Sequence, residues 1–152
     1  MPTIRAAADA DRPAIASLAS EADLFPPEIL PEIIAPYLSG ASAEKWLVAV
    51  ASGEVVGFVY AAVEAMADNV WNMRALAVSS GARGSGVGRA LVDAIESKAK
   101  GDGGRSMLVD TSSADAFAAT RAFYVGRGYG LEATIRDYWS PGDDKATFSK
   151  RL

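Results

Sequence analysis

Hydrophobic and polar residues alternate in blocks along the 152-residue chain, and the spacing within each block predicts strands or helices. Runs rich in β-branched and aromatic residues, bounded by turn residues, are typical of strands. The predicted strands cover residues 3–7, 46–51, 55–64, 70–78, 105–111, 129–139 and 145–152. Apolar residues at helical spacing predict helices over about 11–22, 87–101 and 115–126. The order is a mixed α/β arrangement within a single domain, residues 1–152.

The segment between the first predicted helix and the second predicted strand lacks a clear period. Prolines at 26, 27, 31 and 36 interrupt residues 28–39. Proline removes a backbone N–H group and clashes with the preceding turn of a helix. We therefore expect a broken helix here, or a loop that carries short helical turns.

Alternating glycines separate the predicted strand 70–78 from the helix 87–101, in the stretch Arg83-Gly84-Ser85-Gly86-Val87-Gly88-Arg89. Glycine permits tight backbone turns, and the free N–H groups at the start of a helix attract anions. A Walker A loop is excluded because it needs Lys and Ser/Thr after its last glycine. A dinucleotide-binding fingerprint is also excluded, because it needs a small residue at the position of Arg89. The stretch predicts a site for an anionic cofactor, and the alternative is a glycine-rich turn without a ligand.

The composition narrows the chemistry. The chain has no His and no Cys, and its formal net charge is -4. A Ser-His triad, a cysteine nucleophile, a disulfide and a histidine-based zinc site are therefore excluded, and we expect no metal. The acidic balance argues against nucleic acid as a partner and favours a cationic one. No apolar run suits a membrane span and the first residues do not resemble a signal peptide, so we expect no membrane association and a cytoplasmic location.

The pattern Arg-x-x-Gly-x-Gly at residues 83–88 resembles the pyrophosphate-binding motif of the GNAT superfamily of acetyl-CoA-dependent N-acetyltransferases. A second stretch, Phe123-Tyr124-Val125-Gly126-Arg127-Gly128-Tyr129, resembles that family's Phe-Tyr-x-x-x-Gly-Phe/Tyr segment. The order of predicted elements is similar to the GNAT fold from end to end. The resemblance implies a central, mostly antiparallel mixed sheet of about six to seven strands flanked by about four helices.

The resemblance also implies acetyl-CoA as the cosubstrate. Backbone groups on the strand 70–78 would pair with its pantetheine arm as an added strand does, and N–H groups of the glycine loop would hold the pyrophosphate. The cofactor-binding residues that it implies are Leu76, Ala77, Val78, Arg83, Gly84, Ser85, Gly86, Val87, Gly88 and Arg89. Arg83, Arg89 and Arg121 are candidates for pairing with the phosphates, although each also suits an exposed position without a ligand.

Tyr124 matches the family tyrosine that commonly protonates the leaving thiolate. A phenol suits this task because it is neutral before it donates its proton, so no charge has to be desolvated. By periodicity alone, Phe117, Thr120 and Tyr124 also form the inward stripe of a core helix. Because the glycine loop accompanies this segment, we favour the catalytic role.

The general base has no single candidate in the sequence. Many members of the family place a glutamate on the strand that corresponds to 70–78, but this strand contains no carboxylate. The alternatives are Glu64, Asp68 and a water molecule held by Asn72.

The acceptor site is expected between segment 25–37 and the final hairpin, on the basis of the same resemblance. The candidate substrate-binding residues are Trp71, Asn72, Tyr138 and Trp139. The carboxylates that would attract a cationic amine are those of Glu28, Glu32 and Asp137. Ordinary core aromatics and surface carboxylates account for these residues equally well.

These features favour an enzyme that transfers the acetyl group of acetyl-CoA directly to a primary amine of a small molecule or a peptide. Direct transfer fits the absence of cysteine, because no acyl-enzyme is needed. The alternatives are a non-catalytic acyl-CoA sensor with the same fold and a structural subunit. The sequence leaves the acceptor amine and a homodimer open.

Overall fold

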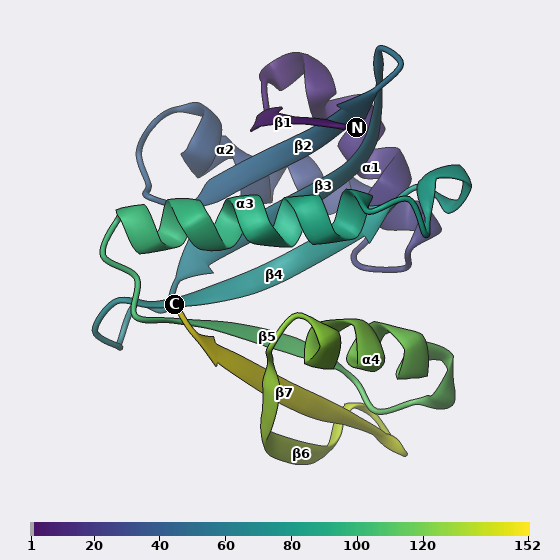
Figure 1. Ribbon diagram of the computed structural model, residues 1–152, viewed down its shortest axis with the longest axis vertical. Helices are drawn as coiled ribbons and strands as arrows, with labels where there is room; N and C mark the ends of the chain where they lie inside the picture. Colours follow the sequence, from purple (N-terminus) through teal and green to yellow (C-terminus); the bar gives the residue numbers. More distant parts are fainter. Residues whose placement is uncertain (1) are drawn as a thin grey trace.

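A seven-stranded mixed sheet with helices on both faces forms the protein, and the computed structural model describes residues 2–152 (Figure 1). The strands are β1 (Thr3–Ala6), β2 (Lys45–Ala51), β3 (Glu54–Val63), β4 (Val70–Val78), β5 (Ser106–Ser112), β6 (Gly130–Ser140) and β7 (Asp143–Arg151). The α-helices are α1 (Arg12–Glu21), α2 (Leu30–Leu38), α3 (Val87–Gly101) and α4 (Ala118–Gly126). The 3-10 turns are η1 (Asp9–Asp11), η2 (Pro27–Ile29), η3 (Ser80–Ala82) and η4 (Asp115–Phe117). The strand order is β1-β2-β3-β4-β5-β7-β6, and all neighbours are antiparallel except β4 and β5.

Each face of the sheet buries its own hydrophobic core. On one face α1 and α2 pack against β2, β3 and the second half of β4, with Ile15, Ile34 and Phe58 fully buried. On the other face α3 and α4 pack against the remaining alternate strand residues, with Leu91 and Ile95 fully buried. The 2.0-residue period of strands and the 3.6-residue period of helices therefore set the two layers, as the hydrophobic pattern predicts. None of the helices in residues 2–152 is long and apolar enough to cross a membrane.

The expected break over residues 28–39 is wrong from residue 30 onward, because α2 is continuous from Leu30 to Leu38. Pro31 lies in the first turn, where a missing N–H group costs nothing, whereas Pro36 lies inside the helix. Leu30 and Ile34 are 2% and 0% exposed, so their burial against the sheet stabilises a helix that the local sequence disfavours.

The two central strands, β4 and β5, are paired over only a short stretch. Their parallel register covers Val70–Asn72 against Ser106–Leu108, and β5 then stays paired with β7 on its other edge. A β-bulge in the β3–β4 pair lies between Tyr60 and Ala61, directly after this stretch. Bulges bend a strand and increase its twist, which accounts for the divergence of β4 from β5 in Figure 1. We call the end of the pairing, at Asn72 and Leu108, the β4–β5 junction.

Candidate functional site

The loop between β4 and α3 has the geometry of an anion-binding turn. Gly84 and Gly86 have φ angles of 79° and 88°, the left-handed region that favours glycine. Gly86 is the N-cap residue of α3 and supplies no side-chain cap, so the first N–H groups of this helix stay free of side-chain partners. A Cβ atom on either glycine would meet no atom within 4 Å, so the space beside the loop is open. An anion can therefore reach the N–H groups directly.

Contacts on both sides of the sheet hold this loop in place. Below α3, a Cβ atom on Gly57 of β3 would lie 2.9 Å from the Ala77 carbonyl oxygen and 3.0 Å from a Leu91 methyl group, so the helix sits very close to the sheet. From the opposite face, Glu21 at the end of α1 accepts a 2.8 Å hydrogen bond from the N–H group of Ser80. The start of α3 is thus fixed by the fold as well as by its glycines.

The three candidate arginines have different surroundings. Arg83 and Arg89 are exposed beside the loop. The Arg83 side chain donates one long hydrogen bond, 3.4 Å, to the Val78 carbonyl oxygen. Arg121 instead donates to the carbonyl oxygens of Ser112 and Ala114 at 2.8 and 2.9 Å, so it holds the turn between β5 and α4. Arg83 and Arg89 are therefore the arginines with side chains available to an anion at the loop.

The predicted backbone residues Leu76, Ala77 and Val78 lie on β4 beyond the β4–β5 junction. On one edge they pair with β3, and the pairing of β4 with β5 ends before them, at Asn72. Backbone groups on the edge toward β5 are therefore free for an extended ligand that adds to the sheet.

Tyr124 lies near the end of α4 and is 5% exposed. Its ring contacts the rings of Phe123 and Tyr129 edge-on, at centroid distances of 5.4 and 5.8 Å. Burial raises the pKa of this phenol well above its usual value, which keeps the group protonated. The ring belongs to the core on the α3 face. The geometry suits a neutral proton donor.

A polar cluster spans the β4–β5 junction on the opposite face of the sheet. It consists of Glu64, Asn72, Asp110, Lys145 and Thr147. Asn72 is 8% exposed, and its side-chain amide donates to Glu64 at 2.9 Å and to Asp110 at 3.4 Å. Thr147 donates to Asp110 Oδ1 at 2.6 Å, and Lys145 Nζ lies 3.9 Å from Asp110 Oδ2. The cluster joins side chains from β4, β5, β7 and the end of β3.

The cluster does not include every base candidate from the sequence. Glu64 and Asn72 contact each other directly. Asp68 lies in the turn before β4, where its side chain is 84% exposed and 3.9 Å from Arg105, so it lies outside the cluster. No group of three or more His, Cys, Asp or Glu side chains suited to a metal ion occurs within residues 2–152.

The structure brings two of the three predicted aromatic residues together. Tyr138 and Trp139 lie in a bulge of β6 opposite the start of β7, are 51% and 49% exposed, and contact each other edge-on. Lys145 of the polar cluster lies 4.2 Å above the Tyr138 ring, so this bulge borders the cluster. Trp139 donates from its indole nitrogen to the Thr111 carbonyl oxygen at 3.3 Å.

Trp71 is separate from this pair. It is 2% exposed, belongs to the core on the α3 face, and fills the space beside Gly104, where a Cβ atom would lie 2.8 Å from its ring. It pairs in register with Met107, four residues before Thr111 on β5. The expected aromatic wall is therefore formed by Tyr138 and Trp139 without Trp71.

Sequence reasoning missed Asp110, Lys145 and Thr147. The signal for Asp110 was a lone carboxylate at an outward position of the strand 105–111, where Met107 and Val109 are the inward residues. Lys145 and Thr147 gave no comparable signal, because their relation to Asp110 depends on the register of β7 against β5. Long-range register cannot be read from spacing along the chain.

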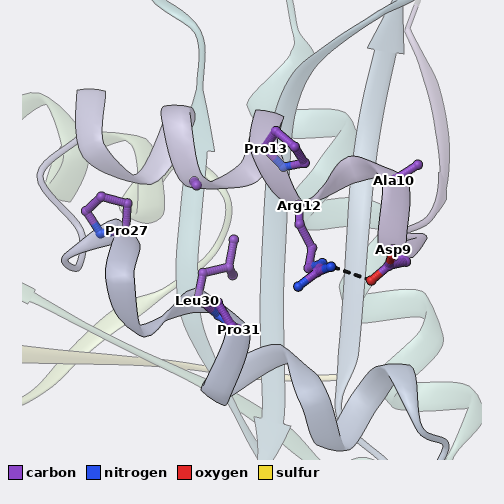
Figure 2. A pocket seen from close by; sticks show the side chains of 8 residues that line it. Asp9, Ala10, Arg12, Pro13, Pro27, Leu30 and Pro31 are labelled. Carbon is purple, nitrogen blue, oxygen red and sulfur yellow. Dashed lines mark ion pairs between the residues drawn. The ribbon is translucent and has the colours of Figure 1, made fainter.

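A separate hollow of about 460 Å³ lies between η1, the start of α1, η2 and α2 (Figure 2). Its lining includes Pro13, Pro27 and Leu30, and the Arg12 side chain points into it beside Asp9, at 2.8 Å. This hollow is at the other end of α1 from Glu21, the residue that contacts the loop before α3. It is therefore distinct from the loop, Tyr124 and the polar cluster.

Comparison with protein-family models matches residues 13–129 to the acetyltransferase (GNAT) family. A comparison with curated protein sequences found no match. Residues 13–129 contain the glycine loop, Tyr124 and three members of the polar cluster, Glu64, Asn72 and Asp110.

Solved structures of acetyltransferases share the fold over nearly the whole chain. A putative GNAT acetyltransferase from Desulfovibrio desulfuricans has a TM-score of 0.88 at 22% identity, with 99% of each chain covered. A ribosomal-protein-alanine N-acetyltransferase from Brucella melitensis has a TM-score of 0.83 at 21% identity, with 99% of each chain covered. A phosphinothricin acetyltransferase from Sinorhizobium meliloti, in complex with acetyl-CoA, has a TM-score of 0.80 at 22% identity, with 99% of this chain and 88% of that chain covered. At such identities the likeness concerns the fold, which confirms the architecture expected from the sequence.

Proposed function

We propose that this chain, which belongs to the acetyltransferase (GNAT) family, binds acetyl-CoA and transfers its acetyl group directly to a primary amine of a small molecule or a peptide. The observation that carries the proposal is the uncapped start of α3 beside the free edge of β4. A diphosphate and an extended amide chain are the parts of acetyl-CoA that these two features suit. The residues present therefore fit this cosubstrate.

The loop and β4 define a path for the cosubstrate. N–H groups of residues 84–89 hold the pyrophosphate, with Arg83 and Arg89 as counter-charges. Backbone groups of Leu76–Val78 pair with the pantetheine arm. The Val78 carbonyl oxygen then bonds to the arm in place of its long hydrogen bond from Arg83. From Val78 back to Asn72 the strand spans about 20 Å, at about 3.3 Å per residue. An arm laid along this edge leads to the β4–β5 junction, where the bound cosubstrate supplies an activated thioester.

Tyr124 donates its hydroxyl proton to the departing thiolate. In the overall reaction a C–N bond forms, the C–S bond of the thioester breaks, and the sulfur leaves as a free thiol. The amine enters as an ammonium ion and loses two protons during the reaction. One proton is released to solvent. The other replaces the proton that Tyr124 has given to the thiolate. Burial keeps the phenol neutral and protonated before the reaction. Because a thiolate is a weaker base than a phenolate, Tyr124 gives up its proton together with the arrival of the amine proton that replaces it.

The acceptor side favours a positively charged amine. The carboxylates of Glu64 and Asp110 and the exposed rings of Tyr138 and Trp139 attract an ammonium group by charge and by cation–π contact. This surface lies on the face of the sheet opposite Tyr124. The amine and the proton donor for the leaving thiol therefore lie on different sides of the acetyl group.

Thiol release from acetyl-CoA tests the proposal. The purified chain should release free thiol faster when a suitable amine is added, and mass spectrometry should find the matching acetylated product. The panel consists of spermidine, phosphinothricin, an aminoglycoside and a peptide that begins with alanine, since two structural neighbours carry the names of enzymes for phosphinothricin and for a ribosomal-protein alanine.

Binding measured by calorimetry separates the remaining alternatives. A chain that binds acetyl-CoA but acetylates no amine would be a sensor, and a chain that does not bind acetyl-CoA would have a structural role. Either result would contradict the proposed activity.

A further inference from the structure

We propose that Asp110 on β5 is the proton acceptor for the incoming ammonium group, in place of the carboxylate that β4 lacks. This inference rests on the proposed acetyl transfer. The base then lies on β5, the strand across the β4–β5 junction from β4. Side chains from β4 and β7 contact the Asp110 carboxylate.

The two oxygens of Asp110 have different surroundings. Oδ1 accepts a short hydrogen bond, 2.6 Å, from the Thr147 hydroxyl, its cross-strand neighbour. Oδ2 has only long contacts, 3.4 Å to the Asn72 amide and 3.9 Å to Lys145 Nζ. Ordinary N–H to oxygen hydrogen bonds are about 2.7–3.2 Å long, so Oδ2 keeps capacity for a closer donor. Thr147 thus orients the carboxylate, and the oxygen with room for an ammonium group is Oδ2.

Position along the strands favours Asp110 over Glu64. The N–H group of Glu64 bonds to the Val70 carbonyl oxygen, which places Glu64 at the end where β4 and β5 are paired. Asp110 lies two residues past Leu108, which is about 7 Å farther along β5. At this point β4 and β5 are no longer paired. That is the side of the junction on which the free edge of β4 lies. Asn72 bridges the two carboxylates and acts as a positioning residue.

The proton balance is simple. The ammonium group gives one proton to Asp110 Oδ2 and becomes a neutral amine with a lone pair for attack on the thioester. Asp110 then passes that proton to solvent, which its partly exposed side chain permits. The charged and titratable groups that face Asp110 are Glu64 at the end of β3 and Lys145 on β7, and Tyr138 on β6 lies beneath Lys145.

The test compares Asp110→Asn with wild-type enzyme across pH, using whichever amine of the panel (spermidine, phosphinothricin, aminoglycoside or alanine peptide) is acetylated fastest. At pH 7 we expect kcat to fall about 100-fold or more, because the substitution removes general-base catalysis. Alkylamines have pKa values near 10 and peptide α-amino groups near 8, so solution supplies neutral amine as pH rises. The deficit should therefore shrink to about tenfold or less by pH 9.5. A structural defect would give a deficit that does not depend on pH.

Several controls make this test specific. Asp93→Asn changes the same side chain on the exposed side of α3, where Asp93 lies 3.8 Å from Arg127, and should keep full activity. Asp110→Glu restores a carboxylate and should recover part of the rate. Calorimetry should give an unchanged affinity of Asp110→Asn for acetyl-CoA. Its affinity for the panel amine used in the kinetic test, measured in the presence of CoA, should be weaker by about tenfold because a charge-assisted hydrogen bond is lost. If Asp110→Asn does not fold, Asp110→Ser takes its place, since its hydroxyl can accept the Thr147 hydrogen bond.

The outcomes separate this inference from the proposed function. A wild-type chain that acetylates no amine of the panel would overturn both. An active wild-type chain with an Asp110→Asn variant within threefold of it, or with a deficit that is constant across pH, would overturn the role of Asp110 alone. A Glu64→Gln variant with the larger and pH-dependent loss would transfer the role to Glu64.

Discussion

The proposed cosubstrate side and the proposed acceptor side of this molecule are built in different ways. On the cosubstrate side, the loop before α3 and the edge of β4 offer backbone groups, which are positioned by glycine conformation and strand pairing. On the acceptor side, the polar cluster and the β6 bulge offer side chains from separate strands. Backbone sites tolerate many side chains and suit a shared cosubstrate, whereas side-chain sites can change from one protein to the next.

Replacement of Tyr124, the proposed proton donor, should have the largest effect. Tyr124→Phe removes the proton donor but keeps the ring, so kcat should fall about 100-fold or more while acetyl-CoA affinity and thermal stability stay near normal. Turnover, calorimetry and thermal unfolding measured on the same preparation check this.

The matched control for Tyr124→Phe is Tyr129→Phe, in the same aromatic group. The Tyr129 hydroxyl donates to Glu96 at 2.7 Å, so its loss should lower stability by about 1 kcal/mol with little effect on kcat. Near-normal turnover of Tyr124→Phe would leave water or the amine to protonate the thiolate.

The next largest effect should come from the glycine loop. Gly86→Val forces a β-branched residue into a positive φ angle and places a side chain where an anion approaches, so acetyl-CoA affinity should fall about tenfold or more. Calorimetry on the folded variant measures this. The control is Gly53→Val in the β2–β3 turn, which has a φ angle of 78° and open space but lies outside the loop. Equal acetyl-CoA affinities of the two variants would argue against the loop as the diphosphate site.

Gly57→Ala probes the support under the loop. The added methyl group would meet the Ala77 carbonyl oxygen at 2.9 Å and a Leu91 methyl group at 3.0 Å, so α3 must shift. We expect a loss of about 1–3 kcal/mol in the free energy of unfolding, measured with urea, and weaker acetyl-CoA binding as a consequence. Unchanged stability would show that α3 can move away from β3 without cost.

The smallest effect should come from the exposed aromatic pair. Trp139→Ala removes a ring at the border of the acceptor surface, so KM for the amine should rise about threefold to tenfold while KM for acetyl-CoA stays constant. Leu131→Ala, on the same strand and 60% exposed, is the control and should change neither constant. Equal changes in both Michaelis constants for Trp139→Ala would mean that the residue serves packing, and that the amine binds elsewhere.

Much of the cosubstrate side could be predicted from the sequence, because its signals are local. The strand Val70–Val78 and the helix Val87–Gly101 have the predicted bounds, and Gly84 and Gly86 take the positive φ angles that their place in the loop suggests. Trp71 shows the limit. The neighbouring residues in the sequence do not show whether Trp71 is a core residue or part of an exposed aromatic wall. Its burial arises only when β4 packs against α3.

The sequence by itself determined the family, the order of elements, the glycine loop before α3 and the position of Tyr124 on α4, because short-range periodicity and backbone conformation encode all of these. The tertiary structure decided which side chains meet. The continuity of α2 through Pro36 comes from burial of Leu30 and Ile34. The contact of Asp110 with Asn72 and Thr147 comes from strand register across 38 and 37 residues of chain, a long-range property that local spacing does not contain.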